Sequence, residues 1–65
     1  MSEEKFYAVA FKQNSEWHLH LISSEKGSLN VLPLGRYLRT KKDIKEWFSE
    51  QQNNHDYEEY VLCFE

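Results

Sequence analysis

Hydrophobic and polar residues alternate with a period of two over residues 5–12 and again over residues 16–22. In the first run one side carries Tyr7, Val9 and Phe11, and the other carries Phe6, Ala8, Ala10 and Lys12. In the second run one side carries Trp17, Leu19 and Leu21, and the other carries His18, His20 and Ile22. Alternation of this kind is typical of strands, and two such runs around Gln13-Asn14-Ser15 predict a β-hairpin.

The length of the hairpin loop decides which sides of the two strands share a face. A two-residue loop at Asn14-Ser15 places Lys12 opposite Trp17. A three-residue loop instead places Lys12 opposite Glu16 and gathers the large apolar residues on one face, with Phe11 opposite Trp17 and Val9 opposite Leu19. Because a shift of one residue turns a strand's whole apolar set over, the buried face should fix the register. We therefore predict the three-residue loop.

The middle of the chain contains a second turn signal and a third strand. Ser24-Glu25-Lys26-Gly27 predicts a turn, because Gly27 can adopt a positive φ at little steric cost. A strand is expected over residues 28–32, and Pro33 should end it. Residues 36–39 have no periodic pattern and are expected to be extended or irregular.

One helix is predicted after Thr40, which is a favourable N-cap and forms a capping box with Asp43 three residues later. Ile44, Trp47 and Phe48 recur at helical spacing and define one apolar stripe. The helix is expected to end near Gln52. Residues 57–64 predict a last strand, with Tyr60, Leu62 and Phe64 on one side and Val61 and Cys63 on the other.

The predicted order is βββαβ within a single small domain over residues 1–65. The fold class is α+β: an antiparallel β-sheet of three to four strands with one α-helix packed on one face. The uncovered face would carry Phe6, Ala8, Ala10, His18, His20, Ile22, Val61 and Cys63. This set is too apolar for an ordinary wet surface, so we predict that a second copy covers it in a homodimer, or that another protein does.

The charged residues are divided unevenly along the chain, although the formal net charge is only -3. Residues 36–45 hold five bases and one acid, whereas residues 46–65 hold six acids and no Lys or Arg. Lys41 and Lys42 therefore stand at the expected helix N-terminus, where the helix dipole favours acids. A local rule broken in this way often marks a functional requirement for the charges.

The basic block, residues 36–45, is the candidate anion or nucleic-acid binding site. Free backbone N–H groups at a helix N-terminus attract phosphate. The block adds Arg36, Arg39, Lys41 and Lys42 as cations and Tyr37 as a stacking surface for a base. The structural alternative is that the block faces the acidic residues 46–65, within one chain or across a dimer, with about 0–1 kcal/mol for each surface pair.

Catalytic and metal-binding chemistry has little support in the sequence. His18 and His20 share one side of a strand, but the candidates for a third metal ligand are scattered. Cys63 lacks a nucleophile elbow and a glycine-rich oxyanion loop. We therefore expect no enzyme, no cofactor and no metal site.

The chain also lacks the roughly 20 consecutive apolar residues of a membrane span. Its first four residues lack the basic and apolar regions of a signal peptide, and a single cysteine fits a reducing compartment, so we expect a cytoplasmic protein. The length and the lack of catalytic motifs would suit a small bacterial or phage protein. The sequence thus predicts a non-enzymatic macromolecular interaction module that acts as a homodimer, with nucleic-acid or phosphate binding as the alternative.

Overall fold

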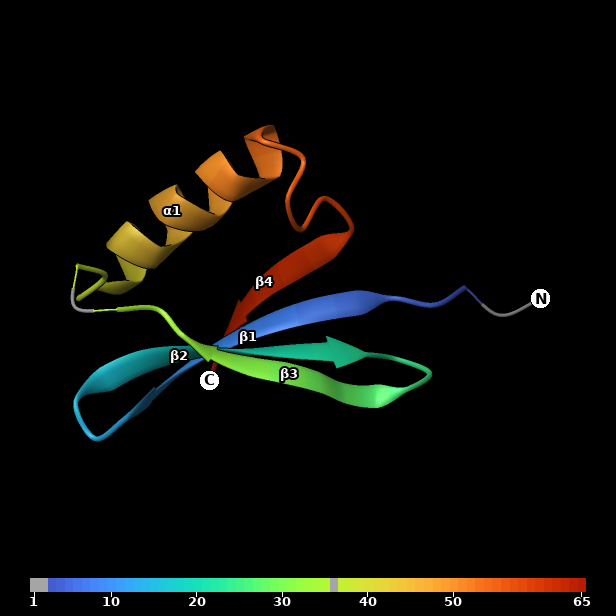
Figure 1. Ribbon diagram of the computed structural model, residues 1–65, viewed down its shortest axis with the longest axis horizontal. Coiled ribbons are helices and arrows are strands. Elements are labelled where there is room, and N and C mark those ends of the chain that lie inside the picture. Colours follow the sequence, from blue (N-terminus) through green and yellow to red (C-terminus); the bar gives the residue numbers. More distant parts are fainter. Residues whose placement is uncertain (1–2, 36) are drawn as a thin grey trace.

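The protein forms a four-stranded sheet with one helix beside it, as the computed structural model shows for residues 3–35 and 37–65. The elements are β1 (Phe6–Gln13), β2 (Glu16–Ser23), β3 (Gly27–Pro33), α1 (Lys41–Asn53) and β4 (Tyr60–Phe64). The sheet order is β3-β2-β1-β4, and β4 lies nearest to α1 (Figure 1). The predicted α+β class and the order βββαβ are confirmed. The last strand joins parallel to β1, which makes the sheet mixed.

A two-residue turn joins β1 to β2, so the predicted three-residue loop is wrong. Asn14 and Ser15 have φ values of 53° and 66°. Positive φ at both central positions is the type I′ geometry, whose twist matches that of the strands it connects. Gln13 consequently lies opposite Glu16, and Lys12 lies opposite Trp17.

This register moves part of the predicted dimer face to the other side of the sheet. Ala8 and Ala10 are fully buried in the core with Ile44 of α1, and Phe6 lies on the same side of β1, with its ring 5.3 Å from that of Tyr60. The placement of Phe6, Ala8 and Ala10 beside the histidines is therefore wrong. Tyr7, Val9 and Phe11 take those positions, opposite Ile22, His20 and His18.

The physical reason lies in how closely a helix can approach a sheet. The two alanines sit on a central strand beneath α1, where larger side chains would hold the helix away. Neighbouring strands supply the bulk instead: Ala10 lies between Leu19 of β2 and Phe64 of β4. Matching large residues with large residues across the hairpin therefore predicted the wrong face.

The capping box predicted at the start of α1 is confirmed. The hydroxyl of Thr40 accepts the backbone N–H of Asp43 at 3.2 Å, and the carboxylate of Asp43 accepts the backbone N–H of Thr40 at 3.3 Å. Ile44 and Phe48 enter the core, and Trp47 is half-buried at its edge. The predicted apolar stripe is thus the face that α1 presents to the sheet.

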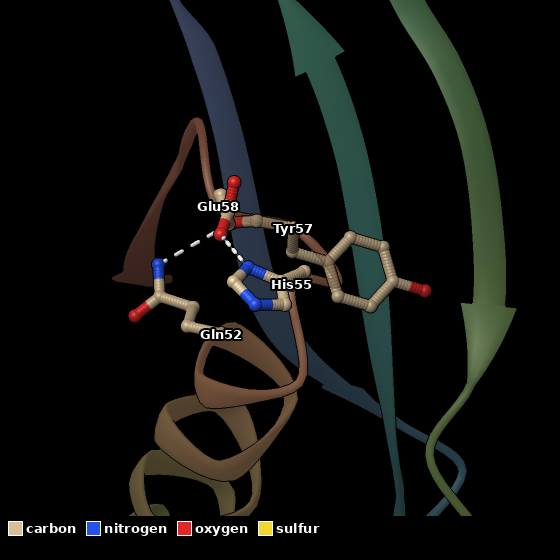
Figure 2. Close-up of polar contacts among 4 residues, drawn as sticks. All are labelled: Gln52, His55, Tyr57 and Glu58. Carbon is tan, nitrogen blue, oxygen red and sulfur yellow. Dashed lines mark hydrogen bonds and ion pairs between the residues drawn. The ribbon is translucent and has the colours of Figure 1, made fainter.

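Side chains at the end of α1 hold the connection to β4 (Figure 2). Gln52 Nε2 donates to the carbonyl oxygens of Tyr57 at 3.3 Å and Tyr60 at 3.0 Å, while His55 pairs with Glu58 on the outer side of the loop. His55 and Tyr57 adopt φ values of 67° and 57°. Because a positive φ interrupts a strand, β4 begins at Tyr60 rather than at residue 57.

Candidate interaction site

The side of the sheet away from α1 carries three rows of side chains, which we call the open face. The first row is Val61, Tyr7 and Ile22, the middle row is Cys63, Val9, His20 and Val31, and the third row is Phe11, His18 and Pro33. No helix or strand of residues 3–35 and 37–65 covers these rows. The structure therefore keeps the predicted His18, His20, Ile22, Val61 and Cys63 together, with new neighbours from β1.

The open face is apolar and partly accessible. Val61 is 57% exposed and Val31 is 48% exposed, on the two outer strands, whereas most of the other side chains are half-buried by their neighbours. Phe11 and His18 stack with ring centroids 5.4 Å apart and planes 18° apart. The largest apolar patch on a soluble protein is often a binding site.

Both histidines of the open face have hydrogen-bond partners within the sheet. His18 Nδ1 lies 3.2 Å from the carbonyl oxygen of Glu16, and His20 Nε2 lies 2.7 Å from the hydroxyl of Ser28. Such contacts satisfy one nitrogen of each imidazole within an otherwise apolar surface. The two rings therefore behave as part of the surface.

The charged residues of the described chain that lie near the open face are at its borders. Lys5 and Glu59 border its first row, beside a shallow hollow of about 740 Å³ that Tyr7 and Val61 also line. Glu16 follows the third row on β2, and Glu65 lies beside Phe11 at the β4 side of that row. The rows themselves contain no Lys, Arg, Asp or Glu. The face is thus an apolar centre between polar ends, as protein–protein interfaces commonly are.

The two edges of the sheet are less suited to binding. Glu65 N–H donates to the carbonyl of Ala10, so the odd-numbered peptide groups of β4 face β1 and the even-numbered groups face outward. The carbonyl of Tyr60, one of the outward groups, accepts Gln52 Nε2. The other edge, β3, has a bulge opposite Leu21 and Ile22 and ends at Pro33, which has no N–H to donate.

The helix N-terminus in the basic block holds an internal acid. The carboxylate of Asp43 accepts the backbone N–H groups of Thr40 and, at 3.4 Å, of Arg39. Lys41 Nζ and Lys45 Nζ lie 5.8 Å and 5.7 Å from the centre of the Phe64 ring. The two lysines therefore pack on the last strand through an aromatic ring.

The other predicted residues of the basic block are spread out. Tyr37 is 94% exposed, and Arg36 lies outside the described residues. The carbonyl of Arg39 accepts the indole N–H of Trp17 at 3.2 Å. A shallow cleft of about 530 Å³ is lined by Trp17, Arg39 and Lys12. The sequence does not predict Lys12 as part of the candidate site. Lys12 joins the cleft only because the two-residue turn places it opposite Trp17.

No protein-family model matches the chain, and neither does any curated protein or solved structure. Within the described part of the chain, no three His, Cys, Asp or Glu residues are grouped as a metal site. Nor does any helix there have the length and apolar content needed to cross a membrane. The functional argument therefore rests on the geometry of the open face.

Proposed function

We propose that this protein is a non-enzymatic interaction module that binds another macromolecule through the open face. The observation that carries the proposal is the uncovered apolar surface, which runs across all four strands and includes exposed Val31 and Val61. A reducing compartment suits the module, because its one cysteine, Cys63, is a free thiol. We place its action in the cytoplasm.

The chemistry of the open face favours a protein as the bound macromolecule. Sheets that bind single-stranded nucleic acid combine stacking aromatics with cations that hold the phosphates. The open face has aromatic rings at Tyr7 and Phe11, but its rows contain no Lys or Arg. An apolar protein surface is the partner that such a face can bury without leaving charges unpaired.

Capture from the native host tests this function. The tagged protein is cross-linked in cells and recovered, alongside the variant Val31→Lys/Val61→Lys and the control Tyr37→Lys. All three altered side chains are exposed in the folded chain, so none of the changes should prevent folding. We expect cross-linked species with the wild type and the control, and their loss with the double variant. Equal recovery with all three proteins would contradict the proposal.

A second candidate function is phosphate or nucleic-acid binding by the basic block. The observation in its favour is the cleft beside Trp17, where Lys12 and Arg39 provide cations next to an aromatic ring. Two lysines of α1, Lys41 and Lys45, both lie over the ring of Phe64. Phosphate contacts made by such cations would weaken steeply with salt.

A salt titration with a mixed-sequence oligonucleotide tests this second function. We expect binding at about 50 mM salt that falls by at least tenfold at about 200 mM. The variant Lys41→Glu/Lys42→Glu should abolish it, whereas Lys26→Glu, in the exposed turn after β2, should lower it only slightly. Absence of binding by the wild type at low salt would exclude this function.

A further inference from the structure

We infer that the partner of the open face is a second copy of this chain. The two copies pack sheet against sheet, and the two-fold axis crosses the strands along the middle row. This inference rests on the proposed function of the open face and names its partner. It follows from the interrupted sheet edges, the area and charge of the face, and the position of the middle row.

Both edges disfavour the simplest alternative, in which another chain adds a strand to the sheet. Gln52 occupies the outward carbonyl of Tyr60 in β4, and the bulge and Pro33 interrupt β3. Strand addition needs a run of free backbone groups along one edge. The side chains of the open face are therefore what the sheet offers to a partner.

The apolar rows are complementary to themselves. An acidic partner would find no cation in them, and a basic partner would find no acid. An apolar, uncharged sheet face of the same size satisfies the open face at every row, and a second copy supplies that face. Isologous two-fold pairing of this kind is the commonest arrangement among homo-oligomers.

The area of the open face indicates how tightly two copies should bind. Four strands spaced by about 4.8 Å and three rows spaced by about 6.6 Å give a flat area of roughly 380 Å² for each copy. Two copies would bury about 800 Å² before the relief of the side chains is counted, below the roughly 1,200–2,000 Å² of stable interfaces and within the range of weak ones. The dimer should therefore form at micromolar rather than nanomolar concentration.

The charges at the ends of the open face distinguish the two possible two-fold axes, one along the strands and one across them. An axis along the strands would place the two acidic ends over one another, with Glu16 of one copy near Glu65 of the partner subunit. An axis across the strands reverses the strand direction, so that Lys5 lies near Glu16 of the partner subunit. Surface ion pairs are weak, but repulsion between like charges is sufficient to set orientation. The geometry therefore favours the axis across the strands.

This axis places each residue of the middle row over the same residue of the second copy. Because the backbones of packed sheets lie about 10 Å apart, the Cα atoms of the two Cys63 residues should be about 10 Å apart, which is too far for a disulfide. An axis along the strands would place β4 over β3 and separate the two cysteines by roughly 17 Å. The single cysteine thus reports the orientation of the dimer.

Sedimentation velocity over about 5–300 μM tests self-association of the purified protein. We expect the mass to rise from that of the 7.9 kDa chain towards twice that value. Val31→Lys/Val61→Lys should weaken the dimer at least tenfold, while Tyr37→Lys should leave it unchanged. A wild-type monomer at 300 μM, or a dimer that the double variant leaves intact, would overturn the inference.

A thiol cross-linker with a span of about 8–10 Å tests the axis. We expect a covalent dimer through Cys63 above the dissociation constant, and none with Cys63→Ser or with Val31→Lys/Val61→Lys. A wild type that is dimeric by sedimentation but is not linked would overturn the axis across the strands.

The two proposals fail in different ways. A purified monomer, combined with host capture that depends on Val31 and Val61, would overturn the second copy as partner and leave the interaction function standing. A purified monomer, combined with host capture that does not depend on Val31 and Val61, would overturn the interaction function as well.

Discussion

Small side chains on one strand determine how this molecule is assembled. Ala8 and Ala10 have no exposed surface, and they let α1 lie close enough for Ile44 and Phe48 to join the core. Larger residues at these two positions would face the helix directly. The alternation of β1 then turns the bulky Tyr7 and its neighbours to the open face.

Enlarging one of these alanines tests the assignment of faces. Ala10→Leu should lower the free energy of unfolding by about 1–3 kcal/mol, because the added carbons have no space beneath α1. The matched change Val61→Leu on the exposed side of β4 should alter it by less than about 0.5 kcal/mol. Urea denaturation at low protein concentration measures both, and a tolerated Ala10→Leu would mean that the alanines face outward.

Serine at position 23 has a structural role that its type alone does not suggest. It is only 2% exposed, and its hydroxyl accepts the backbone N–H groups of Glu25 at 3.2 Å and Lys26 at 3.1 Å while donating to the carboxylate of Glu4. It therefore organises the turn between β2 and β3 and ties the segment before β1 to it.

Replacement of this serine should be costly for its size. Ser23→Ala leaves two turn N–H groups without their acceptor, and we expect a loss of about 1–3 kcal/mol in the free energy of unfolding. Ser49→Ala, at an exposed helix position, is the control and should be neutral or slightly stabilising because alanine favours helix. Thermal and urea unfolding of both variants provide the comparison, and equal effects would refute the role of Ser23.

Turns and caps define the elements in this chain, and they differ in how well the sequence predicts them. The capping box of Thr40 and Asp43 has a specific sequence signature and is found as predicted. The hairpin turn of Asn14 and Ser15 has a weaker one, since serine is not a usual residue at positive φ. The register of the hairpin was therefore the uncertain step.

Glycine at the second turn position should strengthen the hairpin. Ser15 has a φ of 66°, which glycine adopts without steric cost, and Asn-Gly is the preferred type I′ pair. We expect Ser15→Gly to raise the free energy of unfolding by roughly 0.5–1 kcal/mol. Ser15→Ala, which has a Cβ at the same φ, should not be stabilising, and a stabilising Ser15→Ala would contradict the turn geometry.

The charge order of α1 also has a local explanation. Its cations lie at the end where the dipole disfavours them, but Lys41 and Lys45 both pack over the ring of Phe64, and Asp43 supplies the acid at the N-terminus. Cation–π contacts of this kind contribute about 0.5–1 kcal/mol each at exposed sites. The sequence showed the reversed charges, but only the packing of β4 against β1 places an aromatic ring beneath them.

Periodicity was sufficient to predict the fold, because strong alternation and one capped amphipathic stripe define βββαβ. Periodicity was not sufficient to predict the residues of the candidate site. Both sides of β1 are apolar, so the pattern alone does not determine which side faces the helix. The turn geometry and the helix-to-sheet distance decide this, and both are properties of the folded chain. The sequence therefore predicts that His18 and His20 of β2 lie on the uncovered face, but it does not predict that Val9 and Phe11 of β1 lie beside them.

At the scale of the whole fold, the described residues form a sheet with one covered face. A chain of 65 residues buries only about 60% of its unfolded surface, and stability at this size is small. Pairing of two open faces would add a second apolar layer and couple the stability of the fold to protein concentration. The open face is thus a place where function and stability depend on the same residues.

The most direct test of this account is a backbone amide NMR spectrum recorded over about 20–500 μM. The account predicts concentration-dependent shifts that are largest in the middle row, at Val9, His20, Val31 and Cys63, with little change on the outer side of α1. It would be contradicted by shifts that cluster around Lys41 and Lys42, or by a spectrum that does not change with concentration.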